Sequence, residues 1–99
     1  GDWVHWVLFN IPPDINSLSE GIAGEKIQKI GAKQGLNDFG SIGYGGPCPP
    51  PGQTHRYNFK IFALDVTLDL EPAIEKQILL KAVKNHILAK GQLTGAFKR

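Results

Sequence analysis

The first ten residues alternate like a β-strand, and they are apolar on both faces. Residues 2–10 place Trp3, His5, Val7 and Phe9 on one face and Val4, Trp6 and Leu8 on the other. Apolar side chains on both faces predict a strand that is covered on both sides, in the centre of a sheet. Pro12 and Pro13 should end the strand, because proline cannot donate to a strand ladder.

A second alternating stretch covers residues 55–68. One face carries His55, Tyr57, Phe59, Ile61 and Ala63, and the other carries Arg56, Asn58, Lys60, Phe62 and Leu64. The first part of the second face is polar, so we expect it to meet solvent before the strand enters the core.

The pattern then changes to a helical one. Apolar residues recur at spacings of three to five from Ile74 to Ile87 and form an amphipathic stripe. We expect this helix to begin within residues 69–72, with Pro72 in its first turn, and to stop at Gly91. Residues 92–99 predict a short final strand.

The stretch between the two alternating segments has no clear period. Residues 14–46 hold eight glycines, which predicts a long connection with one short strand near residues 25–30. Unstructured connections of this length are uncommon in compact domains and are often functional.

Composition narrows the classes of function. The 99 residues suit one small domain, and contents of 41% apolar and 20% charged residues predict a folded protein. A net charge of +2 without a basic cluster excludes a nucleic-acid face. No run of apolar residues is long enough to span a membrane, and no signal-peptide pattern is present. The single cysteine excludes an internal disulfide and favours a reducing compartment, hence a cytoplasmic protein.

The start of the chain predicts a partial domain. The sequence contains no methionine and opens directly on a strand, without a turn or cap. Strands need sheet neighbours for stability, so we expect residues 1–99 to be a single partial domain. A trimmed but complete domain is the alternative.

A stiff loop precedes the second strand. "GGPCPPPGQTHRY", residues 45–57, is rich in proline and glycine, and it leads directly into His55 and Tyr57, which project from one face. His5 is the polar side chain of the first strand's interior, and it needs a partner if it is buried. His5, His55 and Tyr57 therefore predict a small polar pocket at a strand end. Two structural histidines and a core tyrosine are the alternative.

Other polar residues carry weaker predictions. Arg56 faces away from His55 and is expected in a surface ion pair, and His86 is expected to pack on the helical stripe. Cys48 is expected to be a small filler or a bystander thiol; a Cys48–His55 hydrolase is an alternative that lacks an oxyanion-hole signature. The histidines show no metal-ligand spacing and no P-loop is present, so neither a metal nor a cofactor is expected.

Three segments together resemble a known family: "DWVHWVLFNIPP", "GGPCPPPGQTHRYNFKIFALDV" and "ILLKAVKNHILAKGQLTGAFKR". They are similar to the phosphatidylethanolamine-binding protein family, whose bacterial and archaeal branch they resemble most. The family includes Raf kinase inhibitor protein and plant flowering-time regulators. The resemblance implies a mainly β, sandwich-like fold with a peripheral helix. It departs at an Asp-Pro-Asp-Ala-Pro-like segment upstream of the first strand, which is absent, so the chain resembles the C-terminal part of such a domain.

The resemblance also implies a function. It predicts a non-enzymatic binding module that holds a phosphoryl group or another small anion in a pocket made by His5, Pro49, Pro50, His55 and Tyr57. The implied partners are a phosphorylated or lipid head-group ligand, a kinase, and the upstream segment of the same domain. A serine-protease inhibitor acting through an exposed loop is the alternative.

Overall fold

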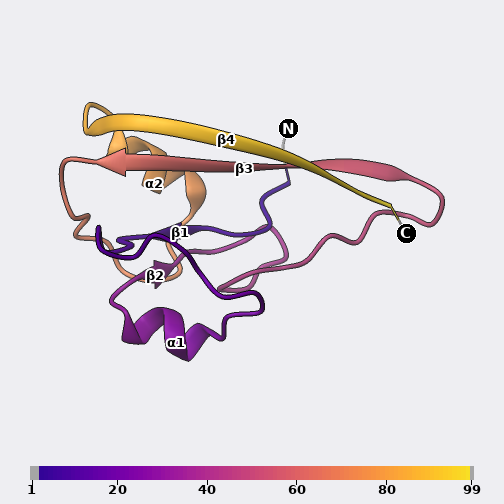
Figure 1. Ribbon diagram of the computed structural model, residues 1–99, viewed down its shortest axis with the longest axis horizontal. Coiled ribbons are helices and arrows are strands. Elements are labelled where there is room, and N and C mark those ends of the chain that lie inside the picture. The colour runs from indigo at the N-terminus through magenta and orange to yellow at the C-terminus, as the bar shows by residue number, and fades with distance from the viewer. Residues whose placement is uncertain (1–2, 99) are drawn as a thin grey trace.

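Two antiparallel strand pairs and two short helices make up the structure, a computed structural model that describes residues 3–98 (Figure 1). The elements follow in the order β1 (Leu8–Phe9), α1 (Gly24–Lys29), β2 (Lys33–Gln34), β3 (Thr54–Leu64), α2 (Lys76–Val83) and β4 (Ile87–Lys98). Figure 1 shows the long β3–β4 pair above, α2 and the β1–β2 pair beneath it, and α1 on the far side of β2.

The β3–β4 pair, called here the β3–β4 ribbon, has the two faces that the sequence predicts. Its register runs from Thr54 opposite Lys98 to Leu64 opposite Ile87, with an irregularity next to Leu64. Asn58 lies opposite Thr94, whose hydroxyl donates to the Asn58 Oδ1 over 2.8 Å. The adjacent pair, Phe59 and Leu93, lies on the other face. The ribbon therefore has one polar face and one apolar face.

Strand β3 enters the core as predicted, although it ends earlier than residue 68. Asn58 and Lys60 are exposed, whereas Phe62 and Leu64 are half-buried. The strand ends at Leu64, and β4 begins at Ile87 instead of residue 92. The mainly β class is confirmed by these two long strands.

Helix α2 is shorter at both ends than the stripe of apolar residues predicts. The expected start within residues 69–72 is wrong because Ala73 has a φ of 69°, in the left-handed region, which interrupts a right-handed helix. The expected stop at Gly91 is also wrong. The helix ends at Val83, Asn85 turns the chain with a φ of 70°, and Gly91 lies in β4 opposite Ile61.

The short strand predicted near residues 25–30 is wrong as well, because this segment forms α1. Four of its six residues are Glu, Lys or Gln, which are good helix formers. Ile27 is the buried residue of the helix, with 2% of its surface exposed. Burial of this one side chain attaches an otherwise polar helix to the body of the protein.

The first strand is shorter and less enclosed than predicted. Among residues 3–98, β1 pairs with β2 alone, so it is not central in a sheet, and Trp3 is exposed. The chain continues the pairing beyond β2, because the Gly35 amide donates to the Val7 carbonyl over 2.8 Å. A Cβ atom on Gly35 would lie 2.6 Å from the Ile74 carbonyl oxygen, so this close approach requires glycine.

The hydrophobic core lies between β1, the segment that follows β3, and α2. Its buried members are Val7, Phe9, Leu68 and Val83, and the partly buried side chains packed against them are Val4, Leu64, Leu70, Ile74, Leu79 and Ala82. Asn10 closes one edge: its Nδ2 donates to the Leu68 carbonyl over 2.7 Å, and its Oδ1 accepts from the Leu68 amide over 2.8 Å. In the part of the chain described, neither helix could cross a lipid bilayer.

Candidate functional site

His5 is held in a fixed orientation by Gly45. Its half-buried imidazole donates from Nδ1 to the Gly45 carbonyl over 2.7 Å, and the Gly45 amide donates to the His5 carbonyl over 2.8 Å. Because a carbonyl only accepts hydrogen bonds, the proton of the neutral ring must be on Nδ1. The other nitrogen, Nε2, is then an acceptor in the neutral ring and becomes a donor only when the ring is protonated.

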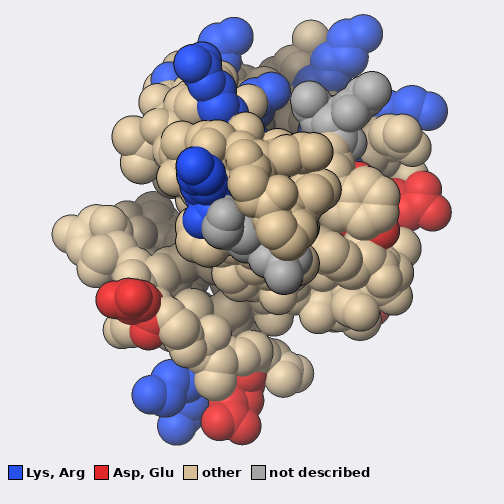
Figure 2. All heavy atoms as spheres, turned by 90° about the vertical axis from the view of Figure 1, so that its right-hand side faces the viewer, with Lys and Arg blue, Asp and Glu red and all other residues tan. Residues whose placement is uncertain are grey.

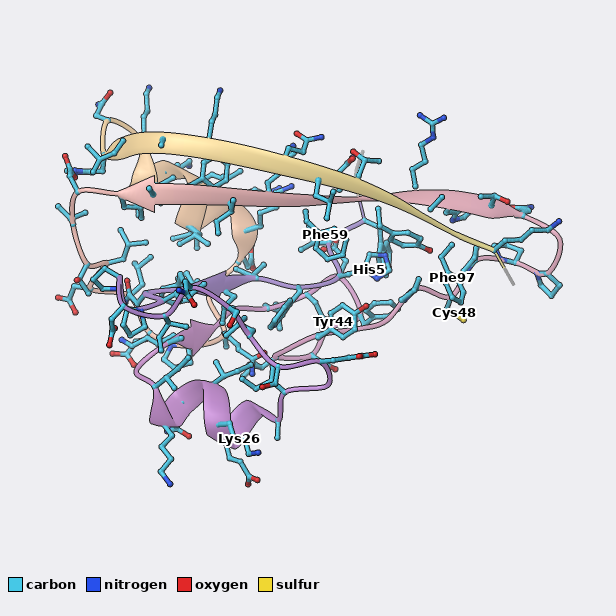
Figure 3. All side chains as sticks on the ribbon, in the orientation of Figure 1. His5, Lys26, Tyr44, Cys48, Phe59 and Phe97 are labelled. Atoms are coloured by element: carbon cyan, nitrogen blue, oxygen red, sulfur yellow. The ribbon has the colours of Figure 1, made fainter. Side chains whose placement is uncertain are left out.

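Tyr57 contacts His5 from the β3–β4 ribbon. The centroids of the two rings are 5.1 Å apart and the ring planes meet at 76°, an edge-to-face arrangement that aromatic rings favour. Tyr57 is half-buried, as His5 is. Figure 3 shows Phe59 and Phe97 on the same side of the ribbon, the side that faces His5.

Two polar atoms of this pair have no hydrogen-bond partner among residues 3–98: His5 Nε2 and the Tyr57 hydroxyl. Neither is a fully buried atom that lacks a partner, so both remain accessible from outside. The two groups come from distant parts of the sequence and lie side by side. Chemically, they can donate to, or accept from, one small polar ligand.

The proline loop reaches this pair from the Gly45 side. Pro49 is fully buried, whereas Pro50 is exposed and its carbonyl accepts from the Gln53 amide over 3.0 Å in a tight turn. Gly52 has a φ of 83° in this turn, which suits glycine. One proline therefore fixes the loop against the body of the protein, and the next begins the turn toward His55.

His55 lies farther out than the sequence pattern suggests. It shares a face with Tyr57, but its ring is exposed and its Nε2 is 3.1 Å from the Gln53 Oε1. Within residues 3–98, no contact joins His55 to His5. The structure thus brings together His5 and Tyr57 and leaves His55 at the edge of the arrangement.

Sequence reasoning missed Phe39 and Asn37. The Phe39 ring lies edge-to-face against His5 at 5.4 Å and against Trp3 at 5.5 Å. Asn37 is 4% exposed and holds the loop around Phe39. Its Nδ2 donates to the Gly43 carbonyl over 2.9 Å, and its Oδ1 accepts the amides of Phe39 and Ser41. The Asn-Asp-Phe-Gly-Ser series was a usable turn signal for this loop.

The other expected polar contacts differ in outcome. Among residues 3–98 the one contact with salt-bridge geometry joins His86 Nδ1 to Asp65 Oδ1 over 2.8 Å, and it is an ion pair only when His86 is protonated. The ion pair expected for Arg56 is absent from this part of the chain. His86 is a boundary residue between α2 and β4, and Cys48 is exposed. In the same described part of the chain, no group of three potential ligands could hold a metal ion.

Charge is distributed unevenly around the site. Neither strand of the β3–β4 ribbon contains Asp or Glu, and together they carry Arg56, Lys60, Lys90 and Lys98. Figure 2 shows most of the Lys and Arg side chains of this view in its upper half, while acidic side chains and a further basic group lie lower down. The four cations lie on the polar face of the ribbon, opposite to the face that carries Tyr57, so they attract anions toward that polar face.

The mainly β fold and the sequence motifs point to a phosphatidylethanolamine-binding-like protein, and comparisons with known proteins agree. Residues 1–98 match the family described as phosphatidylethanolamine-binding protein. The chain therefore belongs to this family, as the sequence motifs predict.

Similar proteins occur in archaea and bacteria. The chain is 47% identical to a UPF0098 protein of Methanothermobacter thermautotrophicus over 98% of this chain and 64% of that protein. It is 46% identical to one of Pyrococcus horikoshii, over 100% of this chain and 51% of that protein. The chain thus spans about half to two thirds of the length of these relatives.

Solved structures share the fold. A putative phosphatidylethanolamine-binding protein homolog from Chlamydia trachomatis superposes with a TM-score of 0.86 at 42% identity, over 98% of this chain and 59% of that one. YbcL of E. coli, described as a new member of the mammalian family, gives a TM-score of 0.82 at 31% identity, over 98% of this chain and 62% of that one. Both values indicate the same arrangement of elements.

Proposed function

We propose that this chain is a non-enzymatic binding module that holds a phosphoryl group of the kind found in phospholipid head groups, at His5 and Tyr57. The observation that supports this best is that the contacting rings of His5 and Tyr57 each carry a polar atom, Nε2 and the hydroxyl, that has no partner among residues 3–98. His55 and Pro50 form the outer edge of the proposed site, and the buried Pro49 supports it.

The chemistry of the two groups favours an anion. Protonated His5 donates from Nε2, because its Nδ1 is already engaged with Gly45. The Tyr57 hydroxyl can donate a hydrogen bond without carrying a charge. Hydrogen bonds from such donors to a charged oxygen are stronger than bonds between neutral groups. A phosphoryl group has several charged oxygens and can accept from both donors at once.

The surroundings support the same ligand class. The β3–β4 ribbon contains no Asp or Glu, so it adds no negative charge beside the site that would repel an anion. The aromatic rings of Phe39 and Tyr57 both contact His5 and cover part of its imidazole. The name of the family adds phosphatidylethanolamine as a ligand class for its members, and we extend the head-group chemistry to this chain.

The proposal is tested by NMR titration of the intact protein with phosphoethanolamine, inorganic phosphate and ethanolamine. Phosphoethanolamine and phosphate should both shift the resonances of His5 and Tyr57, whereas ethanolamine alone should not. Tighter binding of phosphoethanolamine than of phosphate would identify the head group as the recognised unit. Equal binding would identify the phosphoryl group alone.

Two variants remove the proposed donors while preserving the local structure. His5→Asn retains an amide nitrogen near the position of Nδ1, to donate to Gly45, and removes Nε2. Tyr57→Phe retains the ring contact and removes the hydroxyl. Each should weaken phosphoethanolamine binding by roughly 1.5–3 kcal/mol, which is about tenfold to a hundredfold.

Matched controls come from the same chain. Tyr44→Phe removes the hydroxyl of an exposed tyrosine that packs against Trp6, and Arg56→Ala removes a cation on the opposite face of the ribbon. Both should change the affinity much less than the site variants. The proposal is wrong if Arg56→Ala abolishes binding while His5→Asn and Tyr57→Phe leave it unchanged.

A further inference from the structure

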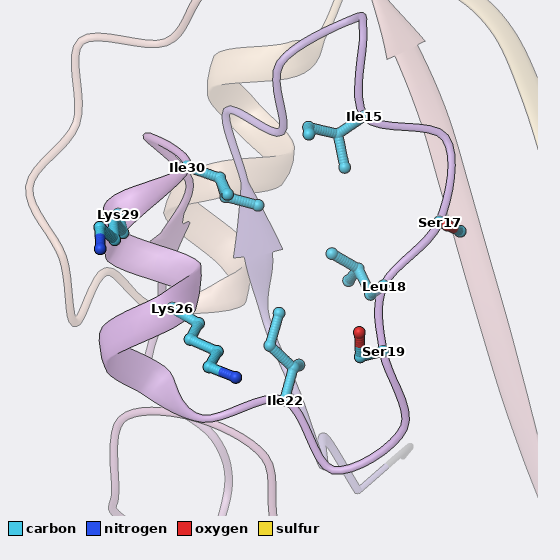
Figure 4. Close-up of a pocket in the computed structure, with 8 residues that line it drawn as sticks. All are labelled: Ile15, Ser17, Leu18, Ser19, Ile22, Lys26, Lys29 and Ile30. Carbon is cyan, nitrogen blue, oxygen red and sulfur yellow. The ribbon is translucent and has the colours of Figure 1, made fainter.

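A hollow lies between the loop that follows β1 and helix α1, in a part of the molecule away from His5 (Figure 3). It has a volume of about 380 Å³ and is lined by four aliphatic side chains, two serines and two lysines: Ile15, Leu18, Ile22, Ile30, Ser17, Ser19, Lys26 and Lys29 (Figure 4). Its size falls at the lower end of the range for small-molecule sites. None of the residues proposed to bind phosphate lines it.

Turns and burial hold the walls of this hollow in place. On the loop side, the Ile15 amide donates to the Pro12 carbonyl over 3.0 Å, and the Ile22 amide donates to the Ser19 carbonyl over 3.2 Å. On the helix side, burial of Ile27 fixes α1 against the body. The hollow is therefore bounded by two segments that each have their own anchor.

The aliphatic lining is only partly covered. Ile15, Leu18, Ile22 and Ile30 are each half-buried, so apolar surface remains open to solvent around a common space. A ligand that covers this surface gains the free energy of removing it from water. The lining contains no aromatic ring, and its side-chain hydroxyls are those of the two serines. These features suit an aliphatic chain better than a base or a sugar.

One cation is directed at the opening. Figure 4 shows the Lys26 amino group reaching over the hollow from α1, while the Lys29 side chain extends from the outer side of the helix. No carboxylate among residues 3–98 forms an ion pair with either lysine. Lys26 is thus available to a ligand whose apolar part lies against the four aliphatic side chains.

We propose that this hollow binds a medium-chain aliphatic carboxylate, with its hydrocarbon chain against Ile15, Leu18, Ile22 and Ile30 and its carboxylate paired with Lys26. The apolar lining selects the chain, and the single directed cation selects a negative head over a neutral or positive one. This site is separate from the one at His5 and Tyr57 and does not depend on the function proposed there.

The test is a methyl-detected NMR titration of the intact protein with hexanoate, octanoate and decanoate, each below its micellar concentration. We expect shifts of the methyl groups of the four aliphatic residues. Each added methylene that is fully buried should strengthen binding by about fourfold, until the hollow is filled. Decanol, which has the same chain without the charge, should bind about three- to fivefold more weakly than decanoate, as expected for one exposed ion pair.

Variants separate the role of the cation from general attraction. Lys26→Gln should weaken decanoate binding by about three- to fivefold and leave decanol binding unchanged. Lys29→Gln, three residues along the same helix, should have a much smaller effect on either ligand. Leu18→Ala should weaken both ligands while the amide spectrum outside the hollow stays the same. Tyr57→Phe should change neither.

Three results would overturn the proposal. The first is an affinity that does not depend on chain length. The second is an equal effect of Lys26→Gln and Lys29→Gln on decanoate. The third is a set of shifts confined to the apolar face of the β3–β4 ribbon, which would place the fatty acid on that exposed surface instead.

Discussion

The imidazole of His5 and the phenol ring of Tyr57 stand edge to face, 5.1 Å apart between centroids, although they come from opposite ends of the long connection in the chain. The contact joins the first extended segment to the β3–β4 ribbon. Each of the two rings carries a polar atom without a partner among residues 3–98, Nε2 in His5 and the hydroxyl in Tyr57. The same contact therefore attaches the ribbon to the first extended segment and brings together the two residues proposed to bind the ligand.

Anion binding at this pair should depend on pH with a definite sign. Because Nδ1 donates to Gly45, His5 can donate to an anion through Nε2 only in its protonated form. Affinity should therefore be highest at low pH and fall as the pH rises and the imidazole loses its proton. Titration calorimetry with a sulfate monoester is the suitable measurement, since a phosphate monoester itself titrates with a second pKa of about 6.

The matched variant is His5→Asn, which keeps a donor toward Gly45 but cannot be protonated. Its affinity should be low and nearly independent of pH. His55→Ala should retain the pH dependence of affinity of the unmodified protein, because His55 is exposed and hydrogen-bonded to Gln53. If the pH dependence of affinity were lost in His55→Ala and kept in His5→Asn, His55 and not His5 would be the histidine that donates to the anion.

Asn37 should be among the most sensitive polar positions in the chain. Its side-chain amide makes three hydrogen bonds, and the residue is only 4% exposed. Asn37→Ala therefore leaves two backbone amides and one backbone carbonyl without their hydrogen-bond partner. We expect a loss of about 3 kcal/mol in the free energy of unfolding, measured by chemical denaturation of the intact protein. Asn58→Ala, on the exposed face of the ribbon, is the control and should change stability by about 0.5 kcal/mol or less.

Asn37→Asp gives a second, independent readout. The carboxylate can still accept from the amides of Phe39 and Ser41, but it cannot donate to the Gly43 carbonyl unless it is protonated. Folding should therefore favour the protonated form. The variant should gain stability as the pH falls and lose it as the pH rises. If the variant lost the same unfolding free energy relative to the unmodified protein at every acidic pH, the hydrogen bond to Gly43 would contribute little.

The alternating residues of β3 could be read directly from the sequence, because a period of two records which face each side chain occupies. The pattern predicted that Asn58 and Phe59 lie on opposite faces of the strand. It also placed His5 and Tyr57 in one candidate cluster. The contact between these two rings is present, and their role in binding remains a prediction.

The start of α2 could not be read in the same way. The apolar stripe runs through Ile74, but the left-handed φ of Ala73 is imposed by its surroundings: the Ala73 amide donates to the Gln34 carbonyl, and the Ile74 carbonyl accepts from Leu36. These bonds join the segment to residues distant in the sequence. Helix α1 is a similar case, since the burial of Ile27 depends on tertiary packing. His55, in turn, is turned outward by a local bond to Gln53 that no periodicity records.

The last prediction concerns Asn10, which combines an unusual backbone with two specific hydrogen bonds. Its φ is 58°, in the left-handed region, and its side chain bonds both the amide and the carbonyl of Leu68, a core residue. Asn10→Gly keeps the backbone accessible and loses the two bonds, so it should cost roughly 2 kcal/mol of unfolding free energy. Asn10→Ala loses the same bonds and adds a left-handed alanine, so it should cost about 1 kcal/mol more.

Asn16→Ala, an exposed position in the following loop, controls for the loss of an asparagine. Denaturation curves of the three variants of the intact protein separate the two effects. If Asn10→Gly and Asn10→Ala were equally stable, the left-handed backbone conformation would contribute nothing to stability. If both were as stable as the unmodified protein, the two hydrogen bonds to Leu68 would contribute nothing either.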